Sequence, residues 1–493
     1  MRNVFLEDPS LIFEVRQGLE RETLRVDHDG VASHKDHPEK LGSKLTHPSI
    51  TTDYSENLLE FITDVSKETG NLLDKLTKLH SYTLKKLDSE MFWPFSMPAI
   101  LPENENDIPL AYFGESNVGK LKTLYRKGLG HRYGRSMQSI AGVHYNFSFS
   151  DNFWNMIKDS TKSDKSLEQI KSEGYFHIIR NFQRYRWMLM YFFGASPAVH
   201  KSFLKGKEHR LEKLGDDAYI TPFGTSLRMG GLGYTSNAQA SIKICYNKVE
   251  TYIETLEKAR LTPYEKYEKI GLKKDDEYLQ LNTHILQIDN EFYTNIRPKN
   301  VARSRESALQ ALHLRGVEYL EVRLLDNDPF SAVGISEDTI NFLHLFLIWC
   351  YTSESPEIVS SECEEFDQKF EKIVTQGRAK DLEFISGGKS VLMRDELTKN
   401  MMEIAKIARV ISQVEPSYQV SFDLQLEKIT NINKLPSSKI LSEVEKRGYT
   451  DAALNIAERF SYQFREKTYD FKELEDLSKS SWEDEKKVRE EDT

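Results

Sequence analysis

Acidic side chains occur close together in short stretches that alternate like β-strands. In the segment 18–25, Glu20 and Glu22 lie two positions apart, so on a strand both carboxylates project from the same face. A core strand favours Val or Ile at such positions, and neighbouring carboxylates repel each other unless a cation lies between them. A hard divalent metal with oxygen ligands would satisfy both acids. The alternative is an exposed strand whose acids pair with Arg21 and Arg25.

Two further acids stand in a similar setting. Glu60 lies between apolar residues in the strand-like segment 58–63, where a carboxylate must face a polar site. Asp53 follows two threonines at a predicted turn, so it is either a turn cap or a second ligand.

In the segment 318–326, Glu321 and Arg323 share one face of a predicted strand. They either neutralise each other or serve a metal–phosphate site, the acid for the metal and the guanidinium for phosphate oxygens.

A histidine joins this set from another predicted strand, at 140–149. His144 and Asn146 lie on its polar face, and the opposite face is apolar, which is typical of a half-buried strand. A lone histidine in a strand is more often a hydrogen-bonded core residue than a ligand. If the polar faces of all these strands converge, however, one hypothesis accounts for every acid and for His144: a sheet face that binds several divalent metals.

Hard oxygen ligands with one imidazole favour Mg²⁺ or Mn²⁺. Several such metals beside arginines indicate a polyphosphate substrate, hence ATP. The sequence has neither a GxxxxGK[ST] nor a GxGxxG motif, so the phosphates would be held by metals and by Arg126, Arg228 or Arg323.

The composition narrows the class of protein. The chain has 493 residues, 39% hydrophobic and 29% charged, with a net charge of −10. These values fit a globular protein with a sizeable core, and they disfavour nucleic acid as a partner. Three cysteines without a CxxC motif indicate a reducing cytosol and no thiolate metal site. No secretory signal is present, and the longest apolar run, 342–350, is too short to span a bilayer.

The elements that must position the site follow from periodicity and capping signals. We expect helices at 68–88, 121–135, 167–193 and 248–260, and a buried helix capped by Ser336. The segments 280–297 and 317–325 are predicted as strands, and 204–219 as a loop. The fold class is therefore α+β, with helices around a mainly antiparallel sheet. We expect a catalytic domain at 1–395 and a mostly helical extension at 396–493, whose charged tail from about 472 is a solvated helix or disordered.

These stretches together resemble the bacterial glutamate–cysteine ligase family of the enteric type. The resemblance runs in order from about residue 15 to residue 350 and loosens in the C-terminal third. It is carried by the motifs at 18–25 (GLERETLR), 51–54 (TTDY), 58–63 (LLEFIT), 123–126 (TLYR), 142–147 (GVHYNF), 193–197 (FGASP), 225–228 (TSLR), 232–235 (LGYT), 296–299 (IRPK) and 318–323 (EYLEVR).

The resemblance implies ATP-dependent joining of the glutamate γ-carboxylate to the cysteine amine through a γ-glutamyl phosphate, the first step of glutathione synthesis in the cytoplasm. It also implies a curved, funnel-like sheet similar to the glutamine synthetase catalytic domain, and a monomer without membrane or nucleic-acid partners. The implied metal ligands are Glu20, Glu22, Asp53, Glu60, His144 and Glu321, for Mg²⁺ or Mn²⁺. Arg126 and Arg323 are implied at the ATP phosphates, with Glu321 also catalytic, and Arg228 at the glutamate carboxylate. Asn146, Tyr125, Gln138, Tyr234 and Tyr293 are expected to bind substrate, the last four at the cysteine pocket.

Three other functions use the same residues. A carboxylate–amine ligase with a different acceptor differs only in a small pocket, where one methylene is worth roughly 1–3 kcal/mol. A metal-dependent phosphohydrolase would release phosphate from ATP without an acceptor. A non-catalytic protein with a calcium-type structural site would not turn over ATP at all.

Overall fold

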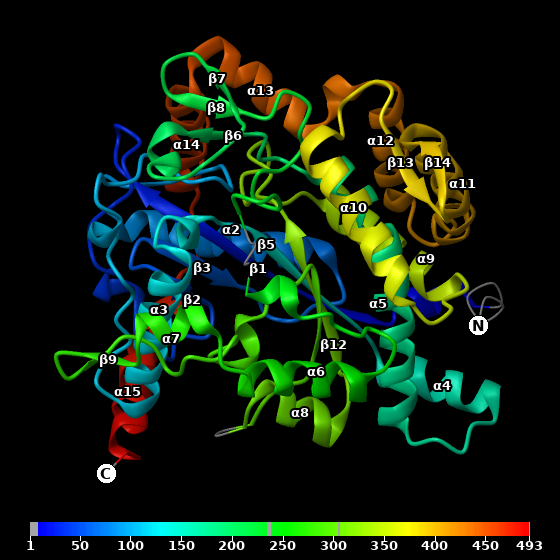
Figure 1. Ribbon diagram of the computed structural model, residues 1–493, viewed down its shortest axis with the longest axis horizontal. Helices are drawn as coiled ribbons and strands as arrows, with labels where there is room; N and C mark the ends of the chain where they lie inside the picture. The colour runs from blue at the N-terminus through cyan, green and yellow to red at the C-terminus, as the bar shows by residue number, and fades with distance from the viewer. Residues whose placement is uncertain (1–7, 234–237, 304–305, 493) are drawn as a thin grey trace.

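The computed structural model describes residues 8–233, 238–303 and 306–492 (Figure 1). A seven-stranded sheet lies at its centre, with the order β11-β12-β5-β1-β3-β2 and with β4 also paired to β1. All neighbouring strands of this sheet are antiparallel. The strands are β1 (Val15–Val26), β2 (Ile50–Thr52), β3 (Leu58–Ile62), β4 (Met91–Phe92), β5 (Val143–Phe149), β11 (Ile296–Lys299) and β12 (Tyr319–Leu325).

Strand β1 holds the sheet together because it is long enough to pair with three neighbours. Its first part, from Val15 to Arg21, pairs with β5, and the segment 20–24 pairs with β3. Its last residues, Arg25 and Val26, pair with β4. The acidic segment predicted as a strand therefore lies in the middle of the sheet rather than at an exposed edge.

One face of the sheet is covered by apolar helices. The apolar residues of β5 and β12 pack in one core with α5 (Leu167–Phe193) and α9 (Glu337–Thr352). Helix α5 begins with a capping box between Ser166 and Gln169 and ends at Gly194, and Ser336 caps α9 by accepting a hydrogen bond from the Thr339 amide. Both helices agree with the sequence predictions. Because one sheet face is filled by this core, polar side chains of the same strands must lie on the other face.

Most other predicted helices are also present, within a few residues of the predicted bounds. They are α2 (Thr69–Lys86), α3 (Asn117–Tyr133) and α6 (Val249–Leu261). The predicted loop at 204–219 instead contains β7 (Glu212–Leu214) and the start of β8 (Ala218–Ile220), which form a small sheet with β6 (Ala198–His200). The other elements between β5 and β12 are α4 (Asp151–Thr161), α7 (Glu265–Ile270), β9 (Lys273–Lys274), β10 (Glu277–Tyr278) and α8 (Ala308–Arg315).

The strand predicted at 280–297 is wrong except for its last residues, which form β11. Polar side chains in this segment bond to nearby backbone groups instead of leaving them to a strand ladder. Gln280 donates to the carbonyls of Tyr267 and Gly271, and Gln287 accepts from the amide of Leu281. Such local side-chain hydrogen bonds compete with regular secondary structure.

The C-terminal part is helical and shares its core with the rest of the chain. Helix α12 (Ser417–Thr430) packs on α9, and helix α14 (Tyr449–Glu466) packs on α2 and β4. Buried residues of these helices, such as Phe422 and Phe464, belong to the same apolar cluster as the central sheet. The elements are α10 (Ser360–Gln376), β13 (Glu383–Ser386), β14 (Lys389–Leu392), α11 (Met393–Ile411), α12 (Ser417–Thr430), α13 (Pro436–Arg447), α14 (Tyr449–Glu466) and α15 (Lys472–Glu490). None of the helices among the described residues is both long and apolar enough to cross a membrane.

The charged tail forms the regular helix α15, which docks on the N-terminal part of the chain. The Ser43 amide donates to Ser481 Oγ at 2.9 Å, and Trp482 Nε1 donates to the Glu39 carbonyl at 3.2 Å. The close approach requires a glycine at position 42, where φ is +90° and an added Cβ would lie 2.5 Å from Ser481 Oγ. Figure 1 shows α15 beside α3. The tail is thus anchored to the part of the chain that precedes β2.

We expect Gly42→Ala to lower the free energy of unfolding by about 1–3 kcal/mol, because the new methyl group adds a steric conflict to an unfavourable φ. Thermal denaturation measures the change, and limited proteolysis should show earlier cleavage within α15. Gly206→Ala is the matched control, since Gly206 also has a positive φ, +70°, but nothing lies within 4 Å of its added Cβ. Equal destabilisation by the two variants would show that α15 does not dock on Gly42 in solution.

Candidate functional site

The strand register places the polar residues of neighbouring strands opposite one another. Glu20 of β1 faces His144 of β5, and Glu22 faces Glu60 of β3. On the other side of β5, Asn146 faces Glu321 of β12. Directly opposed residues have Cβ atoms about 4.5–5.5 Å apart on one face of a sheet. Residues separated by up to 301 positions in the chain (Glu20 to Glu321) are therefore held on one face by backbone hydrogen bonds.

His144 lies at the centre of this polar face, which we call the carboxylate face. Its Nδ1 is 3.1 Å from Glu20 Oε2 and 3.9 Å from Glu321 Oε1, and its Nε2 is 3.9 Å from Glu22 Oε1. Both ring nitrogens thus point at carboxylates. The hydrogen bond with His144 counteracts the effect of burial on Glu20, and the pKa of this carboxyl lies below its usual value.

Three side chains of the carboxylate face have the spacing of metal ligands. Glu20, His144 and Glu321 each offer a donor atom, and these atoms all lie within 4.8 Å of one another. Asn146 stands beside them: its Nδ2 donates to Glu20 Oε1 at 2.9 Å, and its buried Oδ1 has no hydrogen-bond partner. Carboxylate and amide oxygens with one imidazole fit a hard divalent cation such as Mg²⁺ or Mn²⁺.

Glu22, Asp53 and Glu60 form the other end of the carboxylate face, beyond the three grouped ligands. Burial raises the pKa of Glu60 well above its usual value, and the charges of Glu20, Asp53 and Glu22 raise it further. Burial also raises the pKa of Glu22, and Asp53 adds to the shift. A carboxylate in this position resists ionisation unless a cation arrives to offset its neighbours.

Glu321, in contrast, is surrounded by cations of the protein. Arg323 Nη1 lies 3.1 Å from Glu321 Oε1, and Arg297 Nη1 and Lys299 Nζ lie 3.4 Å and 3.8 Å from Oε2. Burial opposes ionisation of Glu321, but Lys299, Arg323 and Arg297 together hold its pKa well below the usual value. Arg297 and Lys299 were not predicted as site residues, although both belong to the motif at 296–299. Their strand β11 pairs directly with β12, and Arg297 faces Glu321 in the register.

The remaining predicted arginines reach the same face from other elements. Arg126 of α3 donates through Nε to the Asp53 carbonyl and stacks over the Phe113 ring at 4.3 Å. Arg228 is 2% exposed, and its Nη2 donates to the Arg323 carbonyl at 2.9 Å. It packs so closely on the start of β5 that a Cβ at Gly142 would lie 2.2 Å from Nη2. The positive charges of Arg228 and Arg323 both act to lower the pKa of Glu22, against the larger effect of its burial.

Asp326 positions Arg228 and was not singled out from the sequence. Its Oδ1 lies 3.7 Å from Arg228 Nη1 and accepts from Ser226 Oγ at 3.1 Å, and its Oδ2 accepts from the Ala195 amide and Ser196 Oγ, both at 2.8 Å. Asp326 lies just past the end of β12, so its position beside the motif at 318–323 was the only signal in the sequence that could have identified it.

A separate group of aromatic and amide side chains lies beside α3. Gln138 Nε2 donates to the Tyr293 hydroxyl at 2.9 Å, and Tyr293 is close enough to Tyr125 to raise the pKa of its hydroxyl. Burial raises the pKa of both tyrosines well above the usual value, so both hydroxyls stay neutral. Of the predicted cysteine-pocket residues, Tyr234 lies outside the described residues.

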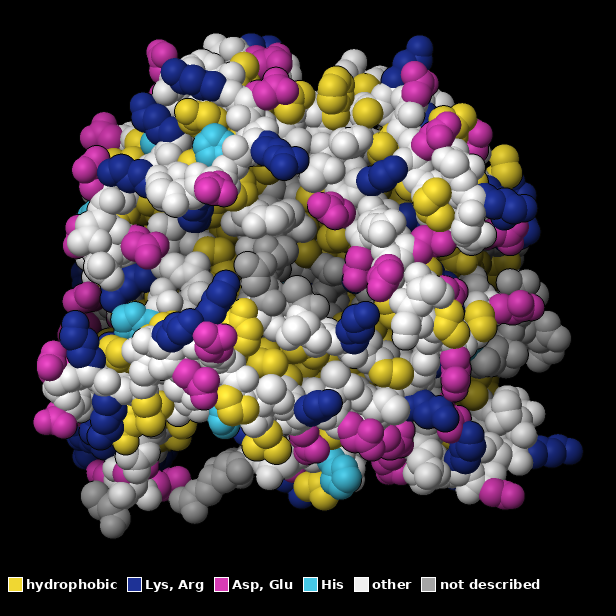
Figure 2. Space-filling view, viewed as in Figure 1, with side chains coloured by type: hydrophobic (Ala, Val, Ile, Leu, Met, Phe, Trp, Pro, Cys, Tyr) yellow, Lys and Arg dark blue, Asp and Glu magenta, His cyan; other side chains and the backbone are white. Residues whose placement is uncertain are grey.

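Buried polar groups hold this aromatic wall in place, and none of them was predicted. Gln239 accepts from the Tyr293 amide at 2.8 Å and donates to the Glu291 carbonyl at 3.0 Å. Glu291 in turn pairs with Arg132 at 3.0 Å and accepts from the Tyr133 hydroxyl at 2.7 Å. Figure 2 shows that the surface on this side of the molecule is hollowed near its middle.

The sequence and the fold of this chain are similar to those of known proteins. The family model described as glutamate-cysteine ligase matches residues 5–373. A glutamate–cysteine ligase of Hahella chejuensis is 45% identical over 464 residues, which are 91% of this chain and 87% of the relative, and one of Pseudomonas fluorescens is 43% identical over 463 residues, 93% and 87%. Among solved structures, a glutamate–cysteine ligase of Francisella tularensis in complex with AMP superposes with a TM-score of 0.91, at 37% identity, covering 97% of this chain and 95% of that one. A bifunctional glutathione synthetase of Pasteurella multocida shares the fold, with a TM-score of 0.77 at 24% identity over 97% of this chain and 58% of that one.

We expect Glu60→Gln to raise the melting temperature of the protein in chelator, because a glutamate at this buried position must either stay charged beside repelling carboxylates or take up a proton, and glutamine does neither. The gain should be about 1–2 kcal/mol of unfolding free energy. In excess Mg²⁺ the order should reverse, since the variant has lost a ligand and gains less stability from the ion. Glu257→Gln, at an exposed position of α6, is the control and should respond to Mg²⁺ like the unaltered protein. A Glu60→Gln protein that is less stable in chelator would contradict the repulsion.

Proposed function

This chain belongs to the glutamate–cysteine ligase family, and we propose that it joins the γ-carboxylate of L-glutamate to the amine of L-cysteine at the expense of ATP. The products are γ-glutamylcysteine, ADP and phosphate, and the reaction is the first step of glutathione synthesis. The observation that carries the proposal is the carboxylate face, where grouped acids and His144 lie directly beside Arg323, Arg297 and Lys299. Acids for metals and cations for phosphates on one surface are what transfer of a phosphoryl group requires.

A carboxylate does not react with an amine directly, because oxide is a poor leaving group. In the proposed reaction a γ-carboxylate oxygen of glutamate attacks the γ-phosphorus of ATP, and the bond from that phosphorus to ADP breaks. The cysteine amine then attacks the acyl carbon of the γ-glutamyl phosphate. The C–N bond forms, the bond from carbon to the phosphate oxygen breaks, and the amine loses a proton to solvent.

Arg323 is proposed to bind the transferring phosphoryl group, with Arg126 at the opposite end of the carboxylate face. A guanidinium carries a fixed positive charge and five donors in a planar fork, which suits phosphate oxygens. Such a cation stabilises the charge that develops during the transfer, provided that it is held in place beforehand. Glu321 serves this purpose, since its carboxylate fixes Arg323 at 3.1 Å while Arg297 and Lys299 balance its charge.

We propose that Glu20, Glu22, Asp53, Glu60, His144 and Glu321 hold several Mg²⁺ or Mn²⁺ ions. When bound, the ions would neutralise both the carboxylates and the phosphates of ATP. The residues fit such ions, because the donors are hard, the Asn146 Oδ1 acceptor is unpaired, and Glu60 resists ionisation without a cation.

The amino acids are proposed to bind on either side of the reacting atoms. Arg228, fixed by Asp326 and by the Arg323 carbonyl, would hold the glutamate α-carboxylate, with Asn146 nearby. Tyr125, Gln138 and Tyr293 would line the cysteine pocket, where their neutral hydroxyl and amide groups can hydrogen-bond without adding charge. We further propose that the protein acts as a monomer in the cytoplasm.

An assay with glutamate, cysteine, ATP and Mg²⁺, each omitted in turn, tests the reaction. Phosphate release should require all four components, and mass spectrometry should detect γ-glutamylcysteine. Phosphate release without an acceptor would identify a phosphohydrolase instead. Faster release with another small amino acid in place of cysteine, each at saturation, would identify a ligase with a different acceptor.

We expect Arg323→Ala to lower kcat by about 10²–10³-fold, the range found when one group that stabilises transition-state charge is removed. The melting temperature should change little, because the side chain is partly exposed and leaves Glu321 paired with Arg297 and Lys299. Steady-state kinetics with all substrates saturating measures the effect. The control Arg315→Ala removes an arginine of α8 that pairs with Glu306, and it should retain full turnover. Normal turnover of the Arg323→Ala protein would exclude Arg323 from the mechanism.

A further inference from the structure

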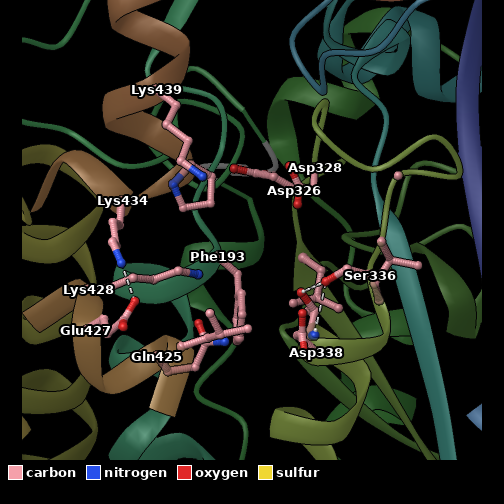
Figure 3. A pocket seen from close by; sticks show the side chains of 16 residues that line it. Phe193, Asp326, Asp328, Ser336, Asp338, Gln425, Glu427, Lys428, Lys434 and Lys439 are labelled. Carbon is pink, nitrogen blue, oxygen red and sulfur yellow. Dashed lines mark hydrogen bonds and ion pairs between the residues drawn. The ribbon is translucent and has the colours of Figure 1, made fainter. Parts of the chain in front are cut away.

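A cavity of about 440 Å³ lies outside the carboxylate face (Figure 3). One wall is made by α12 and α13, and the other by the connection from β12 to α9. Cavities that bind small molecules usually have volumes of about 300–1,000 Å³. The proposed ligation reaction uses none of the side chains in this cavity except Asp326.

The two walls of the cavity carry opposite charges. Figure 3 shows Lys428, Lys434 and Lys439 on the helical wall, and Asp326, Asp328 and Asp338 on the facing wall. Two of these six charges are already balanced. Lys434 pairs with Glu427 on its own wall, and Asp326 pairs with Arg228 behind the cavity. Lys428 and Lys439 therefore face Asp328 and Asp338.

These remaining charges are separated by the width of the cavity. Lys428 Nζ donates to the Phe192 carbonyl at 3.1 Å and lies 5.0 Å from the centre of the Phe193 ring. Asp328 attracts Lys428 electrostatically, but within the described residues no ion pair of 4.0 Å or less joins the two walls. Asp328 accepts from the Phe330 amide at 3.0 Å, and Asp338 accepts from Ser421 Oγ at 3.0 Å. Each carboxylate thus keeps lone pairs for a further donor.

A buried acceptor in the cavity also lacks a partner. Gln425 is 2% exposed, lines the cavity, and its Oε1 accepts no hydrogen bond. Its Nε2 donates to the Ser421 carbonyl at 3.2 Å, which fixes the orientation of the amide. A buried acceptor without a partner lowers the stability of the protein, and a ligand N–H would supply the missing hydrogen bond.

We propose that this cavity binds a zwitterion of amino-acid or short-peptide size. Its carboxylate lies toward Lys428 and Lys439, its ammonium toward Asp328 and Asp338, and an N–H donates to Gln425 Oε1. A ligand with one charge of each sign matches the walls, because the cavity has no net charge left after its internal pairs. A purely anionic or cationic ligand would leave one wall unmatched and partly desolvated.

Asp326 connects this cavity to the site described above. The residue lines the cavity, and its carboxylate holds Arg228, Ser196 and Ser226. A ligand that shifts the chain between Asp326 and Asp328 would also move the support of Arg228. If Arg228 binds glutamate, as the proposed function requires, occupancy of the cavity changes the KM for glutamate more than kcat.

Glycine peptides of two to four residues test the site, because their only charges are the two termini, at increasing separation. Isothermal titration calorimetry and ligand-observed NMR should detect saturable binding of at least one length. The N-acetylated and the C-amidated derivatives of the peptide that binds each lack one terminal charge. Each should bind at least about tenfold more weakly than the parent peptide. Equal binding of either derivative, or no binding at any length, would overturn the proposal.

Variants of the two walls locate the binding. Lys428→Met and Asp328→Asn should each weaken binding at least about tenfold, and circular dichroism and melting curves establish that they fold. Lys406→Met, on α11 and paired with Glu403, is the matched lysine control and should bind normally. Unchanged binding by both wall variants would place the peptide elsewhere and overturn the assignment.

Kinetic measurements test whether occupancy of the cavity affects glutamate binding, separately from whether the cavity binds a ligand. With the binding peptide at saturation, the KM for glutamate should change at least about twofold in the unaltered protein and should not change in Lys428→Met. A KM that responds equally in both proteins would overturn the coupling through Asp326. The calorimetric result does not depend on ligase activity, so failure of the proposed function would be recognised separately from failure of this site.

Discussion

The repulsion among buried carboxylates on one face of the sheet is the constraint on which the rest of the site depends. Glu20, Glu22, Glu60 and Glu321 would separate if their backbones were free to do so. They cannot, because β1 is hydrogen-bonded along its length to β3 and β5, and β5 to β12. A shift of one residue in any of these pairings would turn the acids toward the apolar helices α5 and α9. The apolar core on one face therefore enforces the unfavourable charge density on the other.

The protein offsets this charge unevenly across the face. At the β12 end, Arg297, Lys299 and Arg323 stabilise ionised Glu321. At the β3 end, the strongest influences on Glu60 are burial and the other acids, and Arg126 only partly opposes them. The protein's own cations thus keep Glu321 ionised at the β12 end, whereas Glu60 at the β3 end needs cations from solution to ionise. Such a gradient suits a substrate that arrives with metal ions and presents its phosphates to arginine.

Much of this architecture follows from alternation in the sequence. His144 and Asn146, and Glu321 and Arg323, could be assigned to polar strand faces because each pair alternates with apolar residues. Glu20 and Glu22 were assigned to one face from their spacing of two positions. Helix α9 was predictable because its cap, Ser336, precedes a long apolar segment. The residues that were missed depend on contacts across the chain. Arg297 and Lys299 matter because β11 happens to pair with β12, and no local pattern encodes that neighbour. The docking of α15 on Gly42 joins segments about 440 positions apart, so a charged, weakly apolar stretch could not reveal it.

The end of β12 shows how one strand can serve two sites. Along its regular part, Glu321 and Arg323 point toward the carboxylate face, and Leu320, Val322 and Leu324 are buried on the other side. The register with β5 shifts between Val322 and Leu325, so the strand bends before it ends. Bulges of this kind redirect the side chains that follow them. Asp326 comes directly after the shift and reaches Arg228, while Asp328 reaches the charged cavity. Because a few consecutive residues connect Arg323, the support of Arg228 and the cavity wall, movement in any one of them must be accommodated by the others.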